Sequence, residues 1–216
     1  MSIIAQWHGT DRRLRGFASD QLKTIADGMS DHFHTHGRIP PAAITAKDGT
    51  PLLSWRVAVL QHLRPSLYAR FKLDEPWDSP HNHELLSEMP SFFAAPHRPD
   101  VRSPDTVYQV FVGPGTPFDP AVPFQLPPTD LPLGPSAQLL IVEASRGVPW
   151  TKPEDLPYAP DAPLPALGSC RRYAAPPTLF VPNPCRWMVA IDVLGLPREG
   201  NLDTTDEETL RGSIAP

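Results

Sequence analysis

Two histidines of this 216-residue chain have the spacing that comes nearest to a site for chemistry. His32 and His36 stand four positions apart in a segment with helical periodicity, so both side chains are expected on one helix face. That spacing can hold zinc, but the sequence supplies no third protein ligand beside it. The pair leaves two interpretations open: a metal-dependent hydrolase, or a polar helix end whose histidines face solvent near the helix C-terminus.

Oxygen ligands for calcium stand near the end of the chain. Asp203 and Asp206, with neighbouring carbonyl groups, offer the donors that calcium prefers. The same segment also has the spacing of a helix start, because Thr205 and Glu208 match a capping box. Calcium and a helix cap therefore both remain open here, and no other cofactor is predicted.

Aromatic residues and one isolated carboxylate are candidates for ligand binding. If they are exposed, Trp77, Trp150, Tyr158 and Trp187 would line a groove for a sugar or a peptide. Glu143 ends an apolar run, where burial would raise its pKa and require a partner. It is open whether that carboxylate is catalytic or structural.

No nucleophile elbow, Cys/His nucleophile pattern or dinucleotide fingerprint occurs in the sequence. The net charge is −5 and the lysines and arginines are scattered, so no nucleic-acid partner is predicted. The 30 prolines far exceed the usual share of about 5% and predict many irregular connections. Cys170 and Cys185 could form a disulfide or remain as free thiols.

The elements that must position these residues begin with an amphipathic helix over 11–36 that ends before Gly37. A turn at 47–50 follows, then a helix capped by Ser54 and a short helix capped by Asp78 or Ser79. Strands are predicted at 106–112, 138–144 and 187–193, and the proline-rich stretches 113–136 and 148–184 are predicted to form no elements. Helices first and strands afterwards indicate an α+β fold with an antiparallel sheet.

Several long motifs carry a family resemblance, above all SWRVAVL, LDEPWDSPHN, YQVFVGPGTPF and VPWTKPEDLPY. Across residues 20–216 the chain resembles the DUF1559 family of planctomycete-type bacteria, whose members look like type II secretion pseudopilins. The resemblance implies a pilin-like domain, with an N-terminal helix packed on a small antiparallel sheet. It also implies an anchor in the inner membrane, a periplasmic location, and protein partners or self-assembly.

The first twenty residues depart from that family pattern. They lack the processing site and the long apolar helix of a prepilin, so residues 1–20 are expected to be an extension or a truncated anchor, and residues 21–216 a single domain. As written, the chain is not expected to insert into a membrane, and a cytoplasmic location stays open. The leading hypothesis is a non-enzymatic pseudopilin-like structural or interaction domain, and the alternative is a carbohydrate- or peptide-binding module.

Overall fold

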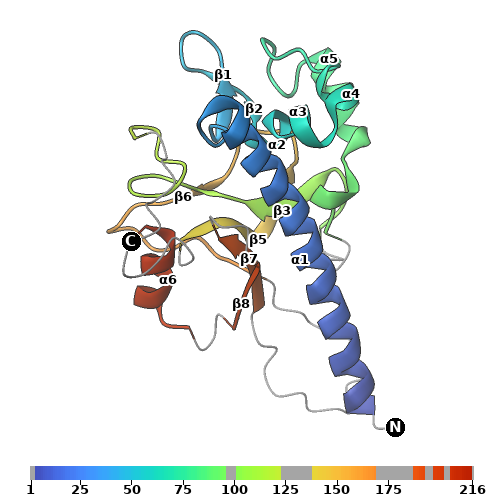
Figure 1. The fold of residues 1–216 in the computed structure, drawn as a ribbon, viewed down its shortest axis with the longest axis vertical. Coiled ribbons are helices and arrows are strands. Elements are labelled where there is room, and N and C mark those ends of the chain that lie inside the picture. Colours follow the sequence, from blue (N-terminus) through green and yellow to red (C-terminus); the bar gives the residue numbers. More distant parts are fainter. Residues whose placement is uncertain are drawn as a thin grey trace.

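A long N-terminal helix crosses a small antiparallel sheet in the computed structural model (Figure 1). The structure describes residues 3–95, 101–122, 138–168, 187–192, 197–201 and 205–215. Helix α1 (Ile3–His36) is the longest element. It ends where predicted, since Gly37 adopts a φ of 70° and its N–H donates to the carbonyl of Phe33.

Short elements follow α1 in close succession. Strands β1 (Ala43–Thr45) and β2 (Pro51–Ser54) form a hairpin whose turn is closed by Asp48, which accepts a hydrogen bond from the Thr50 N–H. The turn predicted at 47–50 is therefore confirmed. Next come α2 (Trp55–Ala58), α3 (Leu60–Leu63), α4 (Pro65–Tyr68), α5 (Pro80–Glu84) and the 3-10 turns η1 (Leu85–Glu88) and η2 (Ser91–Phe93).

Two predicted helix caps are confirmed. The Ser54 hydroxyl accepts from the N–H of Arg56 at the start of α2, and Ser79, rather than Asp78, accepts from the N–H of Asn82. Pro80 occupies the first helical position of α5, where its missing N–H costs no hydrogen bond.

The main sheet has four strands in the order β3-β5-β7-β8, and every neighbouring pair is antiparallel. Its strands are β3 (Asp105–Gln109), β5 (Leu139–Pro149), β7 (Trp187–Asp192) and β8 (Pro197–Asn201). All three predicted strands are present, although the first is divided: its end becomes β4 (Phe111–Val112), which pairs in parallel with β6 (Leu156–Pro157). The prediction that 148–184 forms no elements was wrong, because β6 depends on a distant partner rather than on a local pattern.

Apolar side chains lie on both faces of the sheet. The buried stripe of α1, with Leu22, Ile25 and Met29, belongs to the same core cluster as Val107 of β3 and Ile141 of β5. On the other side, helix α6 (Glu207–Ile214) places Ile214 in a second cluster with residues of β4, β5 and β7 (Figure 1). The mixed α+β fold class is therefore confirmed.

The β4–β6 pairing requires a glycine at position 113. Gly113 has a φ of 155°, and a Cβ there would lie 1.9 Å from the carbonyl oxygen of Tyr158. We expect Gly113→Ala to lower the free energy of unfolding by about 3 kcal/mol, measured by urea titration, because the backbone is strained and the short strand pair must separate.

Gly212 in α6 is a matched control, because a Cβ at that position meets no atom within 4 Å. Alanine is a better helix former than glycine, so Gly212→Ala should raise stability by about 0.5–1 kcal/mol. Equal effects of the two substitutions would contradict the role assigned to Gly113.

Candidate functional site

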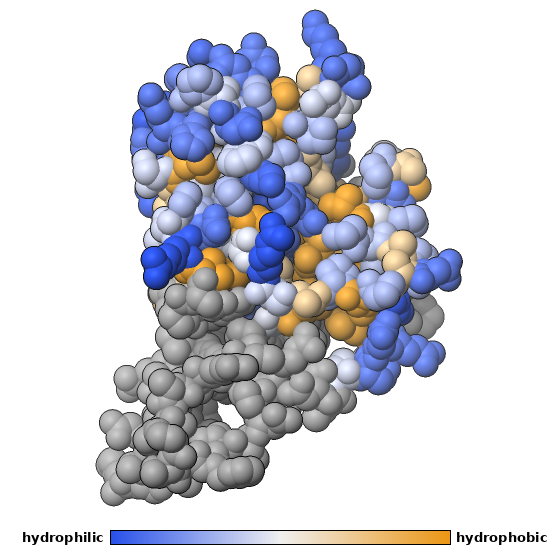
Figure 2. Space-filling view, turned by 180° about the vertical axis from the view of Figure 1, so that it is seen from behind, coloured by the Kyte–Doolittle hydropathy of each residue, from blue (hydrophilic) through white to orange (hydrophobic). Residues whose placement is uncertain are grey.

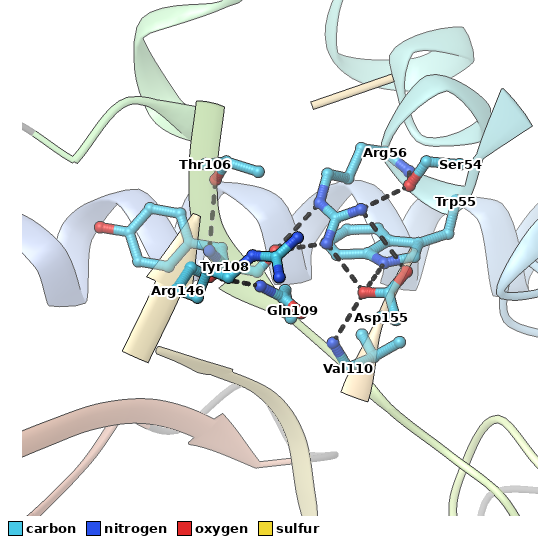
Figure 3. Close-up of polar contacts among 9 residues, drawn as sticks. All are labelled: Ser54, Trp55, Arg56, Thr106, Tyr108, Gln109, Val110, Arg146 and Asp155. Atoms are coloured by element: carbon cyan, nitrogen blue, oxygen red, sulfur yellow. Dashed lines mark hydrogen bonds and ion pairs between the residues drawn. The ribbon is translucent and has the colours of Figure 1, made fainter. Parts of the chain in front are cut away.

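Arg56 of α2 and Asp155, just before β6, form a buried ion pair (Figure 3). Other polar groups are hydrogen-bonded around this pair. Arg56 Nη2 lies 2.8 Å from Asp155 Oδ1, and the two side chains are 0% and 3% exposed. The residues are 99 positions apart in the sequence. Burial of two charges is costly unless they are paired and hydrogen-bonded, so the partners of both groups decide what the pair can do.

Every N–H of the Arg56 guanidinium has an acceptor. Nε and Nη2 donate to the carbonyl oxygen of Tyr108 at 2.9 and 2.8 Å. Nη1 donates to the hydroxyl of Ser54 at 2.7 Å and, more weakly, to Asp155 Oδ2 at 3.5 Å, while Nη2 also donates to Oδ1. These five contacts use all five donors of the side chain. The guanidinium also lies over the Trp55 ring, 4.7 Å from its centroid.

The Asp155 carboxylate accepts hydrogen bonds from two segments, α2 and the residue between β3 and β4. Beside Arg56, its Oδ1 accepts from Trp55 Nε1 at 3.0 Å and from the Val110 N–H at 3.0 Å. Burial raises the pKa of this carboxyl above its ordinary value, while the Arg56 charge and the N–H donors act in the opposite direction. Burial likewise lowers the pKa of Arg56. Both groups are thus enclosed by protein partners, an arrangement that holds segments together.

The segments joined in this way are the ones that build the fold. Ser54 ends β2, Tyr108 lies in β3, and Val110 stands at the break between β3 and β4. Asp155 takes the Val110 N–H, and the Val110 carbonyl accepts from the Leu156 N–H at 3.0 Å, which starts β6. The ion pair therefore fixes the point where one predicted strand becomes two.

Sequence reasoning did not select Arg56 or Asp155 as site residues. A signal existed in the motif SWRVAVL, where a single arginine interrupts a continuous apolar run. A charge in such a run predicts a buried partner. The identity of that partner could not be read from the sequence, because several acidic residues are equally available.

Two residues of the predicted aromatic groove, Trp150 and Tyr158, are buried. Trp150 is 0% exposed: its Nε1 donates to the carbonyl of Leu86 at 3.0 Å, and its ring packs in the first core cluster. Tyr158 is 7% exposed and belongs to the second cluster. The groove was predicted on the condition that its rings are exposed, and Trp150 and Tyr158 do not meet that condition because each fills space beside the sheet. Trp77 is half-buried, with Lys152 Nζ 5.7 Å from its ring centroid.

Glu143 lies within β5 opposite Tyr108 of β3 and is 3% exposed. Burial and then the Glu143 charge raise the pKa of the Tyr108 phenol well above its usual value. The phenol O–H donates to Gln21 Oε1 of α1 at 2.8 Å. The Glu143 carboxylate, beside Tyr108, therefore lies in the interface between α1 and the sheet.

The predicted histidine pair gains a third ring from α3. The rings of His32 and His36 are stacked with centroids 4.2 Å apart, and the His62 ring lies edge-on at 5.8 and 6.1 Å from them. Even so, among the described residues no group of three or more His, Cys, Asp or Glu is placed to hold a metal ion. We interpret the three as packed rings, and His62 as the member that sequence spacing could not reveal.

The remaining predicted ligands divide between the described and undescribed parts of the chain. Asp206 caps α6, where its carboxylate accepts from the N–H and the hydroxyl of Thr209 at 2.7 Å each. The helix start is thus confirmed, with Asp206 rather than Thr205 as the cap. Asp203, Cys170 and Cys185 lie outside the described residues, as does the side chain of Trp187.

The fold and these polar contacts define a mixed α+β protein with a long helix over an antiparallel sheet. Residues 15–128 match the family described as "Protein of unknown function (DUF1559)". Since this is more than half of the chain, the protein belongs to the DUF1559 family. No curated protein and no solved structure matches it. Among the helices that the structure describes, none is both long and apolar enough to span a bilayer.

Removal of the carboxylate tests the central ion pair. Asp155→Ala leaves the Arg56 guanidinium buried without its counter-charge, so we expect a loss of about 3–5 kcal/mol in the free energy of unfolding, measured by urea titration. Glu88→Ala is the matched control. It breaks a pair with Arg70 whose side chains are 43% and 52% exposed, and it should cost less than about 1 kcal/mol. A loss at Asp155 no larger than at Glu88 would refute the assignment.

Proposed function

We propose that this protein is a non-enzymatic, pseudopilin-like structural or interaction domain that acts through its surfaces. The observation that carries the proposal is the packing of α1 against the antiparallel sheet, with Leu22 and Ile25 fully buried in the same cluster as Val107 and Ile141. A helix held in this way along the sheet is the arrangement expected of a pilin-like domain. The ordering of α1 by Gln21, which joins Tyr108 and the Ser91 carbonyl, adds support.

The hydrogen bonds of the buried polar groups also favour a structural role over a catalytic one. Arg56, Asp155 and Tyr108 direct their polar atoms at backbone and side chains of other elements, so they fix strands in place. On the face shown in Figure 2, hydrophobic residues form separate patches among hydrophilic ones. Such a surface suits contacts made by a few anchoring residues within a larger polar area.

Among the described residues of α1, Phe17 is the best candidate for a hydrophobic contact with a partner. It is 46% exposed and directly precedes the buried Ala18. Phe17 and Val122 are the exposed large hydrophobic side chains of the described residues. Covering the exposed part of a phenylalanine contributes about 1 kcal/mol, or roughly fivefold in a dissociation constant.

We expect Phe17→Asp to weaken self-association, or binding to an envelope partner, by at least that factor. Sedimentation velocity over a concentration series measures the first, and crosslinking in cells followed by recovery of the partner measures the second. Val122→Asp is the matched control: it is 61% exposed but lies outside α1, so association should be unchanged. Association with equal strength in all three proteins would rule out α1 as the contact.

Our second proposal is that the protein is a glycan- or peptide-binding module whose binding residue is Trp77. Its ring is half-buried and carries Lys152 near one face, so an apolar surface and a cation stand together. A sugar ring could pack on the indole while its hydroxyls meet the ammonium group.

Screening of the protein against a glycan array tests this proposal directly. Binding by the wild-type protein that is lost in Trp77→Ala would support it. Arg70→Ala, at an exposed ion pair with Glu88, serves as the surface control and should bind as wild type does. An array without signal for any of the three proteins contradicts the proposal.

A further inference from the structure

We infer that His32, His36 and His62 form an acid-sensitive clasp, which holds the C-terminal end of α3 against the end of α1 while the rings are neutral and releases it when His32 binds a proton. The inference is independent of the proposed function. It rests on the convergence of three imidazoles from two elements, with centroids 4.2, 5.8 and 6.1 Å apart. We refer to these three residues as the histidine clasp.

The hydrogen bonds of the clasp fix how the neutral rings are protonated. His32 Nδ1 lies 2.9 Å from the Arg38 carbonyl oxygen, and His36 Nδ1 lies 3.1 Å from that of His32. A carbonyl only accepts, so each Nδ1 must carry the hydrogen and each Nε2 is left with its lone pair. A proton added to His32 therefore goes to Nε2, and it places a cation against the His36 ring stacked at 4.2 Å.

The described surroundings of His62 offer its Nε2 no hydrogen-bond acceptor that would stabilise a charge. Within the described part of the chain its Nε2 is buried and finds no hydrogen-bond partner. A proton bound there would place a cation against the other two rings with no acceptor for its N–H. Buried polar groups without partners are costly, and buried charges without partners are more so.

The charged groups around the clasp do not favour protonation. Burial is the largest cause that lowers the pKa of His32, the hydrogen bond to the Arg38 carbonyl raises it, and the charges of His36, His62 and Arg38 lower it further, so the pKa is lowered overall. Asp31, which precedes His32 on α1, is exposed, as is Arg64, the C-cap of α3. Exposed charges are screened by solvent, so this single carboxylate offers the rings little compensation.

Leu60 at the start of α3 is fully buried in the first core cluster, so the release is confined to the C-terminal end of this helix, which is less firmly held. It has only four residues, and its N-cap, Val59, provides no side-chain hydrogen bond. It approaches α1 at Gly28, where a Cβ would lie 2.7 Å from Leu63 Cγ. Release of the clasp would therefore open this contact and expose the partly buried Leu63.

The direction of the pH effect follows from the His32 pKa, which burial, the largest cause, lowers below its ordinary value of 6.5. The folded state binds this proton less readily than the unfolded chain, so the contribution to stability is complete above about pH 6.5. It is lost as the pH falls from there through the lower pKa of the folded state. Each unit by which the pKa is lowered corresponds to about tenfold in the folding equilibrium constant.

Urea unfolding of the full chain between about pH 7.5 and pH 5.5 tests the clasp, because ordinary histidines titrate across this range. Wild type should lose stability as the pH falls. His62→Gln, which removes one ring beside His32 at nearly unchanged side-chain size, and His36→Gln, at an exposed position, should each show a flatter dependence of stability on pH. His83→Gln, at an exposed histidine of α5, should follow wild type.

Hydrogen exchange separates a local release from global unfolding. The N–H groups of Leu63 and Arg64, which bond to the Val59 and Leu60 carbonyls, should lose protection on acidification, while that of Leu210 in α6 keeps its own. The result should be the same with EDTA present.

Three outcomes would overturn the inference. The pH dependence of stability could be identical in wild type and His62→Gln, the His32 ring could titrate at or above its ordinary pKa by NMR, or EDTA could abolish the transition. The last result would show that a metal ion, rather than the neutral rings, holds the helices together.

Discussion

A buried guanidinium must have all of its hydrogen bonds made, and this requirement shapes the structure of the protein. Arg56 reaches Ser54, Tyr108 and Asp155 from a position with 0% exposure. Because each acceptor lies on a different segment of the chain, those segments must meet at one place for the charge to be tolerated. Buried ion pairs contribute little net stability compared with apolar packing, but they penalise arrangements in which either partner is displaced.

The arrangement of the neighbouring strands and of the core depends on the Arg56–Asp155 pair. The Val110 N–H is taken by Asp155, so the strand that begins at Asp105 cannot continue regular pairing with β5 and turns instead toward β6. Trp150 packs against Phe71 and Phe93 and donates a hydrogen bond to the Leu86 carbonyl of η1, and α1 contributes to the same core cluster. Motifs that carry the family resemblance thus supply both halves of the contact, although the family match ends at residue 128 and Asp155 lies beyond it.

Local signals predicted the elements well and the contacts between them poorly. The stop at Gly37, the turn at Asp48 and the caps at Ser54 and Ser79 each depend on residues within a few positions, and all are present. The aromatic residues show the opposite behaviour. A tryptophan fits a binding groove or a core equally well, and only its neighbours decide; for Trp150 these are Phe71 and Phe93.

The histidines illustrate the same division. Spacing along one helix was enough to place His32 beside His36, because the periodicity of α1 fixes which side chains share a face. Nothing in the spacing indicated His62, which arrives through the packing of α3. By itself the sequence determined the family, the mixed α+β class and most helix ends, since these depend on local backbone preferences and apolar periodicity. The tertiary structure alone decided which charges are buried, which rings pack together and where a strand divides, because each of these requires partners far apart in the chain.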